Sequence, residues 1–122
     1  MSSTYSRLDR INDTIKRELA ILIQQSLNDP RIGMVSVTAV KVSKDLSHAK
    51  VFVSFLEEGK AVVEGIAALN HASTFLRYQL AQRIDLRVMP LLRFYYDDSL
   101  LRASRITSLI DDAIDKHNDD KQ

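Results

Sequence analysis

The sequence predicts a small α+β domain in which helices pack on a three-stranded sheet. One observation is an amphipathic helical pattern over residues 6–28, ended by the Asp29-Pro30 step. A second is a pair of alternating apolar runs, 34–43 and 48–56, joined by a short polar turn that indicates a β-hairpin. The third is a further helical stretch followed by another alternating run over residues 87–96.

The N-terminal helix has both a core-facing stripe and a start signal. Apolar residues recur at three- and four-residue spacing, namely Leu8, Ile11, Ile15, Leu19 and Leu22. Ser6 and Asp9 have the spacing of a capping pair, so we expect the helix to begin directly after Ser6.

The hairpin runs alternate, with one slip. Val37 and Val40 lie in opposite phases of the first run, which predicts a β-bulge near Ala39-Val40. The second run places its core-facing side chains at every other position: Ala49, Val51, Val53 and Phe55.

The second half predicts two helical stretches, over about 61–72 and 75–84, with a kink between them at residues 71–74. The third strand is expected over 87–96 with Val88, Leu92, Phe94 and Tyr96 on its core face. Pro90 cannot donate a ladder hydrogen bond, so this strand is expected at a sheet edge or with an irregularity.

A final helix is predicted after the Asp97-Asp98-Ser99 cap. Its apolar stripe consists of Ile106, Leu109, Ile110, Ala113 and Ile114. We therefore expect a single domain over residues 1–115 and an acidic, frayed tail over 116–122.

Composition and charge restrict the function classes. Residues 1–105 carry fifteen Lys or Arg against eleven Asp or Glu, whereas the remaining residues carry two against five. A mildly basic body permits phosphate binding. The chain has no cysteine, which excludes disulfides and thiolate chemistry and is compatible with a reducing cytoplasm. We expect no membrane span, because no apolar run approaches the ~18 residues that one requires.

The sequence offers no catalytic pattern, and we expect neither an enzyme nor a bound cofactor or metal. His48, His71 and His117 lack the spacing of metal ligands. Asp97 and Asp98 are better explained as helix caps than as an acid/base pair. There is no Gly-x-Ser-x-Gly elbow and no phosphate-binding glycine loop.

Residues spread from Arg7 to Ile110 resemble the ribosome-binding factor A family. The matching pieces are Arg7, Arg10, Ile11, Asp29-Pro30-Arg31-Ile32-Gly33, Val42-Ser43, Asp45-Leu46, Ala49-Lys50-Val51-Phe52-Val53, Leu69-Asn70, Ala72, Leu76-Arg77, Leu86-Arg87, Pro90, Arg93-Phe94 and Asp98-Ser99. No single piece identifies the family, but the order and spacing of all the pieces together are specific to it.

The resemblance implies a type II KH-like fold with a helix-kink-helix in place of the RNA-binding Gly-x-x-Gly loop. The family has an Ala-x-Gly kink there, and this chain has Ala72-Ser73-Thr74, with threonine at the usual glycine. Ala103 likewise stands where the family often has glycine.

The resemblance also implies a function. It is that of a cytoplasmic assembly factor that binds the immature 30S ribosomal subunit through 16S rRNA. Such a factor supports late maturation, including processing of the 5′ end of the rRNA precursor, and matters most for growth in the cold. It is expected to be a monomer when free, with no membrane and no small-molecule substrate.

The expected RNA-binding residues combine the kink with basic side chains. They are Arg7, Arg10, Arg31, Lys44, Lys50, Ala72, Ser73, Thr74, Arg77, Arg83, Arg87 and Arg93. From composition alone the arginines from Arg77 to Arg93 are better explained as a solvated surface, and the resemblance reverses that preference.

Two further interpretations stay open. Phe52 and Tyr95 could stack on bases, although core packing is the better explanation for Phe52, and the two explanations are about even for Tyr95. The alternative function is a protein–protein module whose exposed sheet edge, near Pro90, pairs with a partner strand.

Overall fold

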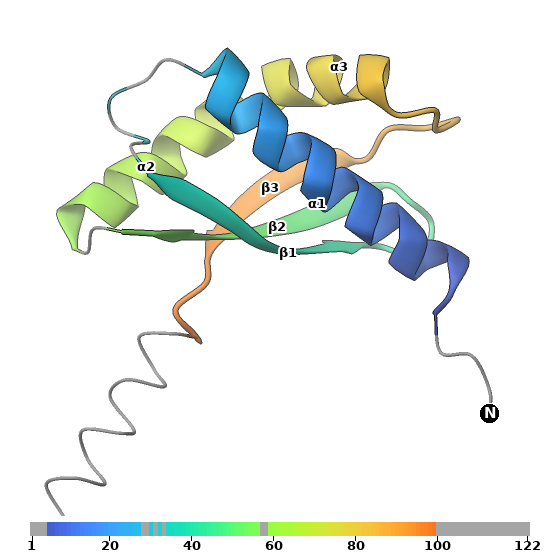
Figure 1. Ribbon diagram of the computed structural model, residues 1–122, viewed down its shortest axis with the longest axis horizontal. Helices are drawn as coiled ribbons and strands as arrows, with labels where there is room; N and C mark the ends of the chain where they lie inside the picture. Colours follow the sequence, from blue (N-terminus) through green and yellow to red (C-terminus); the bar gives the residue numbers. More distant parts are fainter. Residues whose placement is uncertain (1–4, 28–29, 31, 33, 57–58, 100–122) are drawn as a thin grey trace, which may run out of the picture.

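The computed structural model describes residues 5–27, 30, 32, 34–56 and 59–99. The order of elements is α1 (Arg7–Ser26), β1 (Val35–Val42), β2 (His48–Phe55), α2 (Lys60–His71), α3 (Ser73–Arg83) and β3 (Leu91–Tyr96). The three helices lie on one side of a three-stranded sheet (Figure 1). This confirms the predicted α+β architecture. The predicted final helix lies outside the described residues.

Helix α1 begins as predicted. The Ser6 hydroxyl accepts from the Asp9 N–H at 3.1 Å, and the Asp9 carboxylate accepts from the Ser6 N–H at 2.9 Å. These reciprocal bonds satisfy N–H groups that have no partner inside the helix. The stripe then buries Ile15, Leu19 and Leu22 against β1 and α3.

The sheet order is β1-β2-β3, with β1 antiparallel and β3 parallel to β2. Val37 pairs with Val53 and Ala39 pairs with Phe52, so Thr38 is the extra residue of a bulge close to the predicted position. The bulge shifts the alternation of side chains along β1 by one residue. As a result, Val37 before the bulge and Val40 after it both face the helices.

A tight turn joins β1 to β2, and Asp45 organises it. The Asp45 carboxylate accepts from the hydroxyls of Ser43 and Ser47, each at 2.7 Å, and from the Ser47 N–H at 3.1 Å. These donors, the Ser43 hydroxyl first among them, lower the pKa of the Asp45 carboxyl to about 2. Leu46 has a φ of 62°, which is uncommon for a residue with a branched side chain.

Helices α2 and α3 meet at Ala72, within the predicted kink. The Ala72 N–H donates to the Ala68 carbonyl at 3.0 Å, and the Leu76 N–H donates to the Ala72 carbonyl at 2.9 Å. Helical bonding therefore spans the junction while the chain changes direction there (Figure 1). Thr74 is exposed in the first turn of α3, and its φ is not positive. The backbone at this position therefore does not require the glycine that the family pattern has.

Strand β3 starts later than predicted, at Leu91 instead of residue 87. Pro90 has no N–H to contribute to a ladder, and it is buried just before the strand. The prediction for Val88 was therefore wrong, since its side chain is 53% exposed. Leu92 and Phe94 are buried as predicted, and β3 forms an edge of the sheet, as expected for a strand next to proline.

Asparagine side chains from the helices occupy part of both sheet edges. At β3, the Asn70 amide donates to the Phe94 carbonyl at 3.2 Å and accepts from the Phe94 N–H at 2.8 Å. At β1, the Asn12 carbonyl accepts from the Val42 N–H at 2.9 Å. These bonds satisfy backbone groups that an edge strand would otherwise leave without a partner.

Candidate nucleic-acid interface

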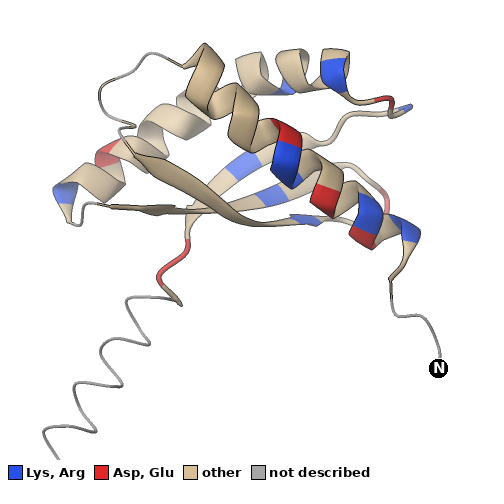
Figure 2. Ribbon diagram, in the orientation of Figure 1, with Lys and Arg blue, Asp and Glu red and all other residues tan. Residues whose placement is uncertain are grey.

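The sheet face opposite the helices carries one basic residue from each strand. Lys41 of β1 pairs in register with Lys50 of β2, and Lys50 pairs with Arg93 of β3. All three side chains are exposed. Figure 2 shows them as one blue segment on each of the three neighbouring strands. We call these three residues the basic row, and the sheet face that carries them the open face, since no helix within the described residues covers it.

The basic row lacks acidic partners within the described part of the chain. None of its members forms an ion pair with a described carboxylate, whereas Lys60 and Arg83 each do so elsewhere. Like charges directly opposite one another on a sheet repel and destabilise it. A polyanion bound across the three strands would convert this repulsion into attraction, and a phosphate backbone is such a ligand.

Two aromatic side chains lie beside the basic row. Phe52 and Tyr95 are register partners two residues beyond Lys50 and Arg93. Their ring centroids are 5.8 Å apart, and their planes are tilted by 31°. The Lys41 ammonium lies 5.8 Å from the centroid of the Phe52 ring. Our preference for Phe52 as a core residue was wrong. Its neighbours Val51 and Val53 take the core-facing positions, which directs Phe52 to the open face.

Two of the predicted RNA-binding arginines form hydrogen bonds to other protein groups on the helix side of the domain. Arg77 is half-buried, and its Nε and Nη2 donate to the Met89 carbonyl at 3.0 and 2.7 Å. Arg83 Nε donates to Glu18 at 2.7 Å and so links α3 to α1. The Arg83 hydrogen bond lowers the pKa of the Glu18 carboxyl. Both arginines hold structure together in the free protein.

The other predicted RNA-binding residues do not lie on the open face together but are spread over other surfaces. Arg7 and Lys44 line one shallow hollow with Leu8, Ile11 and Leu46, where the start of α1 meets the hairpin turn. Arg10 is exposed on α1, and Arg87 is exposed in the segment before β3. Ala72 and Ser73 are half-buried at the helix junction. Arg31 lies outside the described residues. Among the described members of the predicted set, Lys50 and Arg93 alone are register partners on neighbouring strands.

Lys41 is the residue that sequence reasoning missed. Its exposure follows from the bulge, since a phase change at Thr38 directs Val40 and Val42 inward and Lys41 outward. The hairpin turn then places Lys41 opposite Lys50. Both signals are present in the sequence, and together they predict a pair of lysines on one face.

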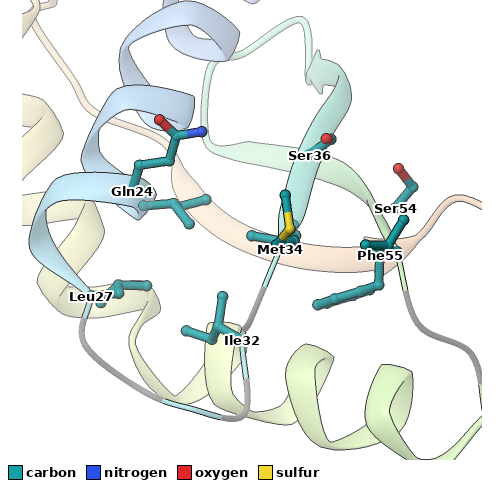
Figure 3. A pocket seen from close by; sticks show the side chains of 10 residues that line it. Gln24, Leu27, Ile32, Met34, Ser36, Ser54 and Phe55 are labelled. Carbon is teal, nitrogen blue, oxygen red and sulfur yellow. The ribbon is translucent and has the colours of Figure 1, made fainter.

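A hollow lined mainly by apolar side chains lies elsewhere in the described structure. It measures about 530 Å³ and lies between the end of α1, the start of β1 and the end of β2. Figure 3 shows Leu27 and Ile32 on one side of it and Phe55 on the other, with Met34 between them. None of its described lining residues is ionisable, so these residues supply neither acid/base chemistry nor an anion site.

No helix among the described residues is long and apolar enough to span a bilayer. No group of three or more histidine, aspartate or glutamate side chains among them is arranged to hold a metal ion.

Comparison with known proteins gives a consistent result. The family model described as ribosome-binding factor A matches residues 7–110. The curated ribosome-binding factor A of Chromohalobacter salexigens is 48% identical over 112 residues, which cover 90% of this chain and 86% of that protein. That of Shewanella amazonensis is 49% identical over 115 residues, covering 93% and 84%.

Solved structures agree with the sequence comparison. The crystal structure of ribosome-binding factor A from Thermus thermophilus matches with a TM-score of 0.66 and 34% identity, covering 75% of this chain and 97% of that one. The solution structure of a Thermotoga maritima protein, titled a putative ribosome binding factor A, gives 0.70 and 33%, covering 81% and 94%. A Thermus thermophilus homology model fitted into a cryo-EM map of a complex with the 30S subunit gives 0.61 and 36%, covering 71% and 91%. This chain belongs to the ribosome-binding factor A family.

Proposed function

We propose that this protein binds the immature 30S ribosomal subunit through 16S rRNA and assists the late steps of its maturation. The observation that carries the proposal is the basic row of Lys41, Lys50 and Arg93, which is in register and has no described acidic partner. Family membership supports the same partner, because a Thermus thermophilus relative has been fitted into a map of its complex with the 30S subunit.

The proposed action is binding and not catalysis. A protein that binds one arrangement of an RNA more tightly than another shifts the population toward that arrangement. Through this shift the protein favours the form of the subunit whose rRNA precursor can be processed at its 5′ end. Since competing RNA pairings are harder to leave at low temperature, the need for the factor is greatest in the cold. We place this work in the cytoplasm and assign it to a monomer.

The remaining basic residues fall into two groups under this proposal. Arg7, Arg10, Lys44 and Arg87 are exposed and available for phosphate contacts around the rim of the domain. Arg77 and Arg83 act indirectly, because their hydrogen bonds to Met89 and Glu18 hold α3 in place. The helix junction at Ala72–Thr74 lies on the helix side of the sheet, and we keep it in the proposal as a second RNA contact, separate from the open face.

Co-sedimentation with small subunits tests the binding. The full chain is mixed with mature 30S subunits or with subunits from an assembly-arrested strain, and the bound fraction is measured over a salt series. We expect tighter binding to the immature subunit and a steep loss of affinity as salt rises, since each phosphate contact releases counterions. The absence of binding to either subunit at low salt would contradict the proposal.

A genetic assay tests the maturation step separately. The protein is expressed in a bacterium that lacks its own ribosome-binding factor A, and the 5′ end of 16S rRNA is mapped by primer extension at low temperature. We expect the precursor end to disappear when the protein is supplied. Unchanged precursor, despite normal subunit binding in the sedimentation assay, would remove the processing role and leave the binding role.

The alternative of a protein–protein module is disfavoured by the state of the sheet edges. A partner strand joining β3 would have to displace the Asn70 amide from both backbone groups of Phe94. Pro90, at the start of that edge, offers no N–H to a partner. Strand addition would also be nearly independent of salt, so the same series separates the two functions.

A further inference from the structure

We propose that the open face holds a single-stranded RNA segment whose bases stack on Tyr95 and Phe52 while its backbone crosses the basic row. This inference rests on the proposed function for the nature of the polymer, and it adds the structural class of RNA and the side chains that contact the bases. Two rows of side chains lie next to each other on this sheet face: the basic row, and an aromatic row of Phe52 and Tyr95.

The two rows have the dimensions of a nucleotide-binding surface. Lys50 and Phe52 are two residues apart on β2, as are Arg93 and Tyr95 on β3. At ~3.3 Å rise per residue, cation and ring are about 7 Å apart, comparable to the separation of a nucleotide's phosphate from its base. Each strand can therefore hold a phosphate and a base of the same polymer at once.

The aromatic row, which consists of Phe52 and Tyr95, is partly exposed. Tyr95 is 36% exposed, and its ring lies beside that of Phe52 at a tilt that leaves both on the same side of the sheet. Ala39 is the register partner of Phe52 on β1, and a hollow of about 240 Å³ lies against Ala39 and Phe52. The small side chain of Ala39 thus leaves space next to the ring for a planar base.

Lys41 links the two rows. Its ammonium lies over the Phe52 ring in the free protein, which is a weak contact at an exposed site. A phosphate is a stronger partner for the ammonium, so RNA binding would draw Lys41 toward the backbone and uncover the ring. Tyr95 is then the first stacking position, and Phe52 is the second.

Carboxylates at one end of the open face determine on which side of the aromatic row the RNA backbone lies. Asp97 and Asp98 follow the end of β3, beyond Tyr95 as seen from Arg93, and they line the hollow together with Lys41. Asp97 accepts from the Thr38 hydroxyl at 2.5 Å, which fixes its carboxylate there. Because carboxylates repel phosphates, the backbone lies over the basic row and the bases lie over the rings.

Single-stranded RNA fits this arrangement and a duplex does not. In an RNA helix the base faces are covered by their neighbours, so a duplex can offer only its backbone to the basic row. Unpaired bases can leave the stack and lie on aromatic rings, a contact that tolerates any sequence. The open face is therefore suited to an unpaired segment of rRNA.

The test measures the affinity of the full chain for a short labelled single-stranded RNA and for a hairpin of the same composition whose stem is closed by a non-nucleotide linker, by fluorescence anisotropy over a salt series. We expect Tyr95→Ala to raise Kd for the single strand about 5- to 150-fold with an unchanged salt slope. Lys50→Ala is expected to lower the slope by about 0.7. Tyr78→Ala is the matched control, since Tyr78 is 63% exposed on α3.

Three results would overturn the inference: equal affinity for the single strand and the hairpin, an equal loss in the Tyr78 and Tyr95 variants, or a normal Kd for Tyr95→Ala. Phe52→Leu keeps an apolar side chain beside Lys41 and serves as the second variant. As a readout independent of affinity, NMR amide shifts on adding the RNA are expected at Lys50–Phe52 and Arg93–Tyr95.

Subunit co-sedimentation of the same variants separates this inference from the proposed function. If the wild-type chain binds subunits and the Tyr95 and Phe52 variants bind equally well, the stacking role fails and the assembly role stands. If the wild-type chain binds no subunit, the assembly role fails, and the contrast between single strand and hairpin still decides the stacking role.

Discussion

Two arginines on the helix side of the domain differ in environment from the three basic residues of the open face. Arg77 and Arg83 are tied to Met89 and Glu18 by hydrogen bonds of 2.7–3.0 Å. Lys41, Lys50 and Arg93 stand opposite one another across three strands without a described acidic partner. The same residue types therefore stabilise the fold in one region and leave charge uncompensated in the other.

A count of charges cannot distinguish basic residues that hold the fold together from those that are available to a ligand. Arginines that already donate to backbone and carboxylate oxygens contribute little to the free energy of binding a ligand, because binding would have to break those hydrogen bonds. Like charges aligned on a sheet lower the stability of the free protein, and a bound anion, as we propose, would offset their repulsion. Substitutions in the two regions should accordingly change different observables.

The largest effect is expected on binding, from replacement of the whole basic row. Lys41→Ala, Lys50→Ala and Arg93→Ala together should weaken RNA binding about 100-fold at 0.1 M salt, since each single-strand phosphate contact contributes ~0.7 to the salt slope. Thermal stability should not fall, because repulsion is relieved. Sedimentation with small subunits and a melting curve measure the two effects.

A matched triple on the helix side serves as its control. Lys16→Ala, Arg17→Ala and Lys60→Ala remove the same charge from exposed helical positions. We expect at most a few-fold change in affinity from long-range attraction, which is screened beyond about 10 Å at this salt. An equal loss in both triples would show that net charge, and not the row, drives binding.

The next effect is on stability, from Arg77→Met. The aliphatic part of the side chain is kept, while both hydrogen bonds to the Met89 carbonyl are lost. Because hydrogen bonds from charged donors contribute about 1.5–3 kcal/mol, we expect the free energy of unfolding to fall by roughly 2 kcal/mol. Urea denaturation measures this loss. RNA affinity of the folded variant should stay within a few-fold of wild type, and a loss matching the row variant would erase the distinction between the regions.

A smaller effect is expected from Arg83→Gln, which breaks the link between α3 and α1. Because solvent screens the pair, the loss in the free energy of unfolding should be small and below that of Arg77→Met. Glu18 should also titrate at a higher pH in the variant, since the Arg83 hydrogen bond is what lowers the pKa of its carboxyl in the wild type. Urea denaturation and an NMR titration check the two statements.

The smallest effect is local to the hairpin turn that aligns Lys41 with Lys50. Asp45 has a folded-state pKa of about 2, below its ordinary 3.8, so its contribution to stability is complete above the ordinary value. That contribution is lost as the pH falls from about 4 to 2. NMR titration of the Asp45 carboxyl should give a midpoint near 2, and a midpoint near 4 would contradict the hydrogen-bonded turn.

The fold could largely be predicted because its signals are local. The Ser6–Asp9 cap, the phase change near Ala39 and the break at Pro30 each depend on a few consecutive residues. The start of β3 could not be predicted, because alternation alone included Val88 and did not reveal that Pro90 is buried ahead of the strand.

The candidate site was less predictable because its alignment depends on distant contacts. The pairing of Lys41 with Lys50 follows from the hairpin, but that of Lys50 with Arg93 depends on a parallel pairing across two helices. Arg83 and Glu18 are separated by 65 residues, so no spacing rule could show that this arginine is already engaged.

Site-specific photo-crosslinking on the small subunit tests the central claim most directly. A photo-reactive amino acid replaces either His48, exposed on β2 at the open face, or Glu64, exposed on α2, so that the basic row stays intact. The account predicts crosslinks to 16S rRNA from position 48 that exceed those from position 64. Crosslinks to rRNA from position 64 alone would contradict it, because the RNA would then lie on the helix side.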